Sequence, residues 1–358
     1  MKTLKLLICF IFLSAIDLSA CTGIKLIAKD GSVVHGRTLE FGVQVNTSLV
    51  VIPRNYRFTS TTPKGKGLTY KSKYAAVGAI TNSTISIMDG INEKGLSIGT
   101  FYFPGFASYT QITKENQDKA LSPLEFPNWI LTQFQNIDEI KTALNNIVIA
   151  PTISKEWGNE PPPFHYIVYE KNGDSIVIEP IDGKLVVYDN PIGVITNSPT
   201  FDWHINNLRN YINLKPENAT PVTLDGIVLT PFGQGSGMTG LPGDFTPPSR
   251  FVKATFFSTS AIPSEDAEKS VFQAFHILNQ FDIPKGIARN VVKDHVIVDY
   301  TMYTNVRDPN SLKFYFKTYD NQNIKVIDLN KFDWDAKKIK KIEVSGFEKP
   351  IDISSDLK

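Results

Sequence analysis

The chain has 358 residues, of which 42% are hydrophobic and 20% are charged, and its formal net charge is +1. This composition is typical of a globular protein with a sizeable core, and the balanced charge excludes the basic footprint of a nucleic-acid-binding protein. We therefore expect no nucleic-acid partner. Beyond the first 20 residues, no apolar run approaches the ~20 residues that a membrane span needs, so we also expect no membrane span.

Residues 1–20 have the form of a secretory signal peptide: two lysines, an apolar run, and small residues that end at Ala20. Cleavage after Ala20 predicts an exported protein, periplasmic or secreted, that begins at Cys21. The chain holds two cysteines, and Cys9 would leave with the signal. Cys21 would then be the one cysteine of the mature protein, and no intrachain disulfide could form.

Cys21 has two interpretations at this position. An N-terminal Cys carries a thiol and a free α-amine, whose unperturbed pKa of roughly 7.7–8.0 suits it to act as general base toward the thiol. However, Leu18-Ser19-Ala20-Cys21 also fits a lipobox, in which the sulfur is alkylated with diacylglycerol and the protein becomes lipid-anchored. The first 25 residues alone favour lipidation. The two interpretations exclude each other, because a thioether sulfur cannot attack a carbonyl.

The chain after Ala20 is predicted to open with a β-hairpin over 21–28 and 32–38, around a turn at 29–31. Hydrophobic periodicity then predicts strands at 49–52, 75–81 and 96–103, helices over 124–134 and 140–147, strands at 165–170, 175–179 and 184–188, helices that begin at Thr200 and after the N-cap residue Ser264, and strands at 296–304, 312–319 and 324–329. No linker or repeat divides residues 21–358, so we expect one α+β domain with layered antiparallel sheets.

Two local patterns that suggest cofactors lack the context those sites need. Residues 235–240 match G-x-G-x-x-G, but Pro231 lies before them and a second proline, Pro242, follows. These prolines exclude the strand and helix of a dinucleotide site, so we expect a tight loop. The five histidines show no metal-ligand spacing. We therefore expect neither a metal nor an organic cofactor.

Four segments together resemble the choloylglycine hydrolase family, which includes bile salt hydrolases and penicillin V acylases. They are CTG at 21–23 with GRTLE at 36–40, GINEKGL at 90–96, TNSPTFDW at 196–203, and GDFTPPSRF at 243–251. The resemblance extends from Cys21 to about Leu329. It implies an N-terminal-nucleophile hydrolase with an αββα sandwich, two antiparallel sheets between helical layers, which agrees with the α+β pattern.

The resemblance also implies roles for individual residues. Cys21 matches the nucleophile, and Arg37 matches an arginine beside the thiol, where a guanidinium would favour the thiolate and lower its pKa. Asn197 matches a side-chain amide of the oxyanion hole, and the backbone N–H of Tyr102 matches a second donor there. Arg250 matches another active-site arginine, near the amine of the nucleophile.

Two positions depart from the pattern of the bile salt hydrolases. Glu40 stands where family members commonly have Asp to hold the terminal amine, and Tyr102 stands where the bile salt enzymes usually have Asn. Some penicillin V acylases also have Tyr there. We expect Phe41, Phe101, Tyr102 and Phe103 to help line an apolar acyl pocket beside the nucleophile.

These observations predict an exported cysteine amidase that hydrolyses linear C–N amide bonds, with a small-molecule amide as substrate. The broader match favours glycine- or taurine-conjugated bile salts over penicillin V or another N-acyl amide. The rival hypothesis is a lipoprotein binding module in which Cys21 is lipidated and the chemistry is lost. Similar family members are often homotetramers, and the insert at 211–229 ends in apolar residues that would find a partner surface, so we also expect a homotetramer.

Overall fold

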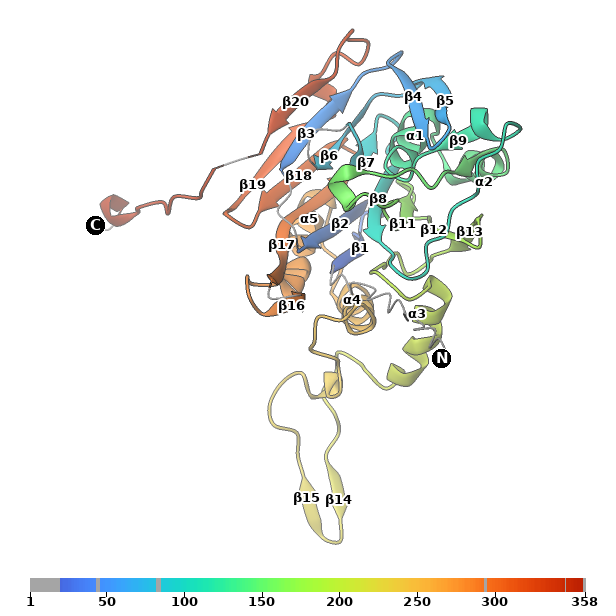
Figure 1. Ribbon diagram of the computed structural model, residues 1–358. Helices are drawn as coiled ribbons and strands as arrows, with labels where there is room; N and C mark the ends of the chain where they lie inside the picture. The colour runs from blue at the N-terminus through green and yellow to red at the C-terminus, as the bar shows by residue number, and fades with distance from the viewer. Residues whose placement is uncertain (1–19, 43–45, 82–84, 293–294, 345, 357–358) are drawn as a thin grey trace, which may run out of the picture.

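Two antiparallel sheets form the centre of the computed structural model, which describes residues 20–42, 46–81, 85–292, 295–344 and 346–356 (Figure 1). The predicted signal peptide, apart from Ala20, therefore lies outside the described residues. The first sheet has the strand order β1 (Cys21–Ile27), β2 (Val33–Phe41), β17 (His295–Asp308), β18 (Lys313–Thr318) and β19 (Asn321–Asp328), and β16 (Ala288–Val292) also pairs with β17. The second has the order β13 (Lys184–Asp189), β12 (Ser175–Ile181), β11 (Phe164–Tyr169), β8 (Ser97–Tyr102), β7 (Ile87–Asn92), β6 (Ala76–Thr81), β3 (Thr47–Ile52) and β20 (Lys340–Glu343).

Helices cover the outer face of each sheet. On the first sheet, α4 (Pro247–Ser260) packs on β1, and α5 (Ala267–Leu278) packs on β2 and β17. On the second, α1 (Phe126–Gln133) packs on β7 and β8, and α2 (Ile137–Leu144) joins the same apolar cluster. The layers thus follow the order αββα, which confirms the predicted fold class. None of the helices in the described ranges is long and apolar enough to cross a membrane.

Apolar side chains fill the space between these layers. One cluster joins the two sheets to α4 and α5. Ile24 and Val34, on the helix-facing side of the first sheet, belong to it together with Ile167 and Val177 of the second sheet, and all four are fully buried. A separate cluster joins the outer face of the second sheet to α1 and α2. Since each large apolar side chain contributes about 1.5–3 kcal/mol when fully buried, these clusters are the main source of stability.

The predicted strands and helices are all present, but two details of the helices are wrong. Asp266, not Ser264, is the N-cap of α5, because its carboxylate accepts a hydrogen bond from the backbone N–H of Lys269 at 2.9 Å. The helix predicted over 140–147 is α2, which already ends at Leu144. Ile147 lies beyond that end and packs against the core from the loop.

Several elements were not predicted. They are α4, β7, β16, β20, the hairpin of β4 (Arg57–Thr62) and β5 (Gly65–Lys71), the parallel pair of β9 (Ala120–Leu121) and β10 (Val148–Ile149), the hairpin of β14 (Val222–Leu224) and β15 (Ile227–Leu229), and 3-10 turns at 117–119, 155–157, 208–211, 236–238, 279–281, 329–331 and 354–356. The β14–β15 hairpin projects away from the sandwich between α3 (Phe201–Asn207) and α4 (Figure 1). Residues 235–240 form a loop with one 3-10 turn, as their flanking prolines predict.

Candidate active site

A short antiparallel bridge brings Cys21 beside Asn197. The N–H of Gly23 donates to the carbonyl of Ile195 at 2.8 Å, and the N–H of Ile195 returns a bond to Gly23 at 3.1 Å. A Cβ at position 23 would lie 2.8 Å from Cγ2 of Ile195, so glycine permits this close approach. Cys21 lies two residues before Gly23, and Asn197 lies two residues after Ile195. There the backbone N–H of Cys21 donates to Oδ1 of Asn197 at 2.8 Å.

Arg250 joins these two residues from the first turn of α4. Its Nη1 donates to the backbone carbonyl of Cys21, and its Nη2 donates to Oδ1 of Asn197 at 2.8 Å. Its Nε donates to the carbonyl of Phe245 at 2.8 Å, which fixes the plane of the guanidinium. Pro247 occupies the first position of α4, where proline favours helix initiation, and this signal was available in the sequence.

Arg37 reaches the site from β2, where it lies opposite Gly23. Its Nη1 donates to Oδ2 of Asp89 at 2.8 Å, and its guanidinium lies 4.3 Å from the centre of the Phe101 ring. Both charged side chains are fully buried. Asp89 was not among the predicted site residues, although a carboxylate within the buried strand β7 needs a buried cation and is recognisable for that reason.

Burial raises the pKa of the Cys21 thiol above its ordinary value of 9.0, although Arg37 acts in the opposite direction. Arg37 does lower the pKa of the thiol, as expected, but burial raises it by more, so the thiol pKa as a whole is raised and not lowered. The thiol sulfur lies 3.8 Å from the backbone carbonyl oxygen of Glu40. At neutral pH the thiol keeps its proton, so nucleophilic attack requires a base.

Glu40 lies at the same site, but in the described chain it does not hold the nitrogen of Cys21. Its Oε1 accepts a hydrogen bond from the hydroxyl of Thr301 at 2.8 Å. Burial raises the pKa of its carboxyl to about 8, against the opposing effect of Arg250. The Cys21 nitrogen is here an amide bonded to Ala20, and its one hydrogen points to Asn197. An α-ammonium group, released by cleavage, would have three hydrogens to share.

The side-chain amide of Asn197 is held in one orientation. Because Oδ1 accepts from Arg250, Nδ2 faces the strand β8 and donates to the carbonyl of Tyr102 at 2.8 Å. The Asn197 carbonyl lies 2.9 Å from Nε2 of His204, whose ring stacks on Phe251. Burial lowers the pKa of His204 to about 4, so the ring is neutral and its Nε2–H is the donor. His204 was not among the predicted site residues, because no local pattern shows this contact.

A small apolar pocket lies at the Cys21 thiol. Phe41 and Tyr102 line it as expected, together with Trp157 and Phe164. Its free volume of about 20 Å³ holds little more than one water molecule. The other two predicted lining residues lie elsewhere, since Phe101 packs on Arg37, and the ring of Phe103 stacks on His165 at 4.2 Å.

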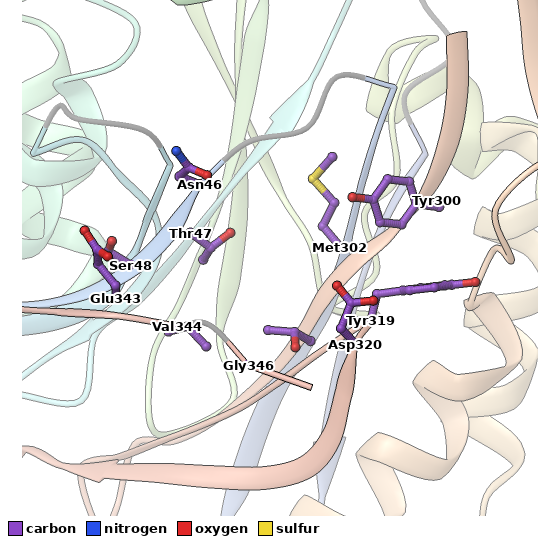
Figure 2. A pocket seen from close by; sticks show the side chains of 11 residues that line it. Asn46, Thr47, Ser48, Tyr300, Met302, Tyr319, Asp320, Glu343, Val344 and Gly346 are labelled. Carbon is purple, nitrogen blue, oxygen red and sulfur yellow. The ribbon is translucent and has the colours of Figure 1, made fainter. Parts of the chain in front are cut away.

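A larger hollow of about 340 Å³ lies between the middle of β17 and the ends of β3, β18 and β20 (Figure 2). It is lined by Asn46, Thr47, Ser48, Tyr300, Met302, Thr318, Tyr319, Asp320, Glu343, Val344 and Gly346. None of these described residues belongs to the Cys21 pocket, and none is a cysteine or a histidine. We therefore place the candidate reaction centre at the smaller pocket. The described ranges also contain no cluster of three or more His, Cys, Asp or Glu side chains arranged to hold a metal ion.

The αββα sandwich and the buried thiol, amide and arginines at the start of β1 define a class of amide hydrolase, and comparison with known proteins identifies the family. A sequence profile of the linear amide C–N hydrolases, choloylglycine hydrolase family, matches residues 21–342. The chain is 37% identical to a bile salt hydrolase/transferase of Clostridium perfringens over 322 residues, which are 89% of this chain and 95% of that protein.

Two solved structures have the same fold. A variant of the conjugated bile acid hydrolase from Clostridium perfringens has a TM-score of 0.83 and 34% identity, over 93% of this chain and all of that one (100%). The penicillin V acylase from Agrobacterium tumefaciens has a TM-score of 0.73 and 25% identity, over 90% and 91% of the two chains. The chain belongs to the choloylglycine hydrolase family and is a hydrolase of linear amide bonds.

Proposed function

We propose that this hydrolase is exported and that cleavage after Ala20 makes Cys21 its N-terminal nucleophile. The observation that carries this proposal is the convergence of Asn197 and Arg250 on the backbone of Cys21, next to a thiol that keeps its proton. The nearby histidines face other groups, since His165 lies 3.0 Å from both Glu179 and the Thr196 carbonyl. The α-amine of Cys21 is then the base best placed to take the thiol proton.

The reaction follows from these positions. The amine takes the thiol proton, and the sulfur attacks the amide carbonyl carbon to form a tetrahedral intermediate. Donors at Asn197 Nδ2 and the Tyr102 backbone N–H stabilise the oxyanion. The ammonium group then protonates the leaving nitrogen, and the C–N bond breaks to leave a thioester on Cys21. Water, deprotonated by the same amine, attacks the thioester carbonyl. The C–S bond then breaks, the acyl group leaves as a carboxylic acid, and the ammonium group returns its proton to the thiolate.

The rival hypothesis, a lipid-anchored binding module, requires a diacylglyceryl group on the sulfur of Cys21. Cys21 is only 4% exposed, and its pocket of about 20 Å³ has no room for two acyl chains. Mass spectrometry of the exported protein separates the hypotheses. We expect the unmodified mass of residues 21–358, whereas a diacylglyceryl adduct on Cys21 would exclude the enzymatic proposal.

For the substrate, we propose glycine- or taurine-conjugated bile salts, with penicillin V or another N-acyl amide as the alternative. The identity of 37% with a bile salt hydrolase/transferase and the higher TM-score of the conjugated bile acid hydrolase support the first choice. Tyr102 favours the alternative, since it lines the pocket and a phenoxy ring could stack on it. Comparison of kcat/KM for glycocholate, taurocholate and penicillin V tests the choice. A tenfold preference for penicillin V would overturn it.

We also propose that the protein assembles as a homotetramer through the β14–β15 hairpin. Its apolar side chains are exposed on the described chain: Val222 53%, Leu224 58%, Ile227 64%, Val228 63% and Leu229 50%. A projecting hairpin with this much apolar surface is typical of an interface between proteins. The hairpin extends away from the sandwich of its own subunit (Figure 1).

A further inference from the structure

Trp157 lines the pocket at the Cys21 thiol. Its ring lies 4.9 Å from the ring of Phe41 and 6.0 Å from that of Tyr102, nearly parallel to the latter, and it meets Phe164 edge-on at 4.8 Å. These four rings line the pocket of about 20 Å³. Because ligand pockets for drug-sized molecules usually have about 300–1,000 Å³, the closed pocket is far too small for a bulky acyl group.

A second cavity adjoins the same turn. Residues 152–156, immediately before Trp157, line a groove of about 610 Å³. Its apolar wall consists of Tyr56, Phe58, Tyr70, Ile85, Leu124 and Ile153. Its volume lies within the usual range for ligand sites. The 3-10 turn Lys155–Trp157 therefore borders both cavities. Trp157 lines the Cys21 pocket, and Lys155 and Glu156 line the groove.

The turn is closed on itself by backbone hydrogen bonds at its base. The carbonyl of Ser154 accepts from the N–H of Trp157 and from that of Asn159, both at 3.1 Å, and Ser154 also pairs with Glu160. Gly158 and Asn159 have φ angles of 72° and 60°, in the left-handed region that glycine and asparagine tolerate best. These contacts hold the turn together as a unit, and the indole meets the pocket through its contacts with the rings of Phe41, Tyr102 and Phe164.

We propose that the pocket and the groove are two parts of one acyl-binding channel, and that the Trp157 indole separates them and sets the size of acyl group that the enzyme accepts. The inference rests on the proposed amidase function and deepens it. The amide carbonyl lies at Cys21, and the acyl group displaces the indole and extends past the turn against the apolar wall at Phe58 and Leu124. The substrate class is an N-acyl amide with a rigid or extended apolar acyl group, larger than phenoxyacetyl.

Two substitutions test the channel from its two sides, with the ratio of kcat/KM for glycocholate to that for penicillin V as the readout. Trp157→Ala should raise this ratio about tenfold, because the bulky acyl group no longer has to displace the indole. Thr59→Trp adds a ring at an exposed position of the groove and should lower the ratio about tenfold. Phe272→Ala, at an exposed position of α5, is the matched control and should leave the ratio unchanged.

The outcomes separate this inference from the proposed function. If the wild-type enzyme hydrolyses neither substrate nor a linear N-acylglycine, the amidase proposal fails, and the channel fails with it. If the enzyme is active and neither substitution changes the ratio, the channel is wrong although the amidase assignment stands. Should Trp157→Ala fail to fold, Trp157→Phe and Thr59→Trp decide the question, since a ratio unchanged in both would overturn the inference.

Discussion

The thiol of Cys21 and the guanidinium of Arg37 are coupled electrostatically, because Arg37 is the largest influence that lowers the thiol pKa against burial. Arg37→Met should therefore raise the pH at which iodoacetamide alkylates Cys21 at half its maximal rate, and Arg37→Lys should raise it less. Loss of the guanidinium also leaves Asp89 without its closest cation, so we expect the free energy of unfolding to fall by about 3–5 kcal/mol in the Met variant. An unchanged or lower alkylation midpoint would contradict this assignment.

The buried carboxyl of Glu40 leads to a second electrostatic prediction, which concerns how the stability of the uncleaved chain depends on pH. Burial raises the pKa of its carboxyl from 4.5 to about 8, so the folded state keeps a proton that the unfolded state has lost at intermediate pH. The stability that this proton contributes is complete below pH 4.5 and is lost as the pH rises through about 8. Urea unfolding of a chain that retains Ala20 should show a loss of a few kcal/mol over this window, at about 1.4 kcal/mol per pKa unit. Glu40→Gln should reduce that loss, and an identical pH dependence in the two chains would contradict the prediction.

Replacement of the Cys21 side chain tests the nucleophile itself. Cys21→Ala should abolish turnover and leave the fold intact, because it removes a single sulfur atom. Cys21→Ser should be nearly inactive, since a hydroxyl is a weak nucleophile at its free pKa and this site is built around a thiol. Circular dichroism provides the control for folding. Turnover by the Ala variant within tenfold of wild type would exclude the proposed chemistry.

At the scale of elements, the bridge between β1 and the segment before α3 determines how closely Cys21 and Asn197 approach. In Gly23→Ala, the new Cβ would lie 2.8 Å from the Ile195 side chain and 2.9 Å from that of Phe101, so the two segments must separate. Since a displacement of about 1 Å can cost about 100-fold in rate, we expect kcat to fall by about that factor. Gly243→Ala, where nothing lies within 4 Å of the added Cβ, is the control and should keep full activity. Equal activity of the two variants would contradict a role for the bridge.

Hydrophobic periodicity identified most strands of the two central sheets, although not β7, β16 and β20, and the helices α1, α2 and α5, because alternation and helical spacing are local properties of the chain. It did not identify α4, since the prolines at 247 and 248 suggest a loop unless they are recognised as the first turn of a helix. It also placed the start of α5 at Ser264 rather than Asp266, because Ser and Asp both favour the N-cap and only the backbone geometry distinguishes them.

Only the site residues that lie within sequence motifs could be predicted. The resemblance pointed to Cys21, Arg37 and Asn197, which the structure brings together. Asp89 lies in β7 and Trp157 lies in a 3-10 turn, both far along the chain from the motifs. Asp89, for example, is 52 residues from its partner Arg37. No spacing rule predicts such contacts, because they arise from the packing of one sheet on the other.

At the scale of the whole molecule, the β14–β15 hairpin predicts the state of assembly. Replacement of residues 222–229 by a Gly-Ser linker removes five exposed apolar side chains, so the variant should be a monomer in light scattering at micromolar concentration, whereas wild type should be a tetramer. The hairpin lies outside the sheets and their helical layers, so the variant should still fold (Figure 1). A monomeric wild-type protein under the same conditions would contradict the proposed assembly.

The most direct test of the proposed N-terminal nucleophile is the identification of the acylated residue. The enzyme is mixed with excess glycocholate for a few milliseconds, quenched in acid and digested with pepsin at the same low pH, which keeps the α-amine protonated and the acyl group on sulfur, and the peptide that contains Cys21 is analysed by mass spectrometry. We predict that this peptide begins with Cys21 and carries the acyl group of the substrate as a thioester, and that the Cys21→Ala enzyme yields no acylated peptide. Turnover by an enzyme whose Cys21 remains joined to Ala20, or a diacylglyceryl group on its sulfur, would contradict the proposed mechanism.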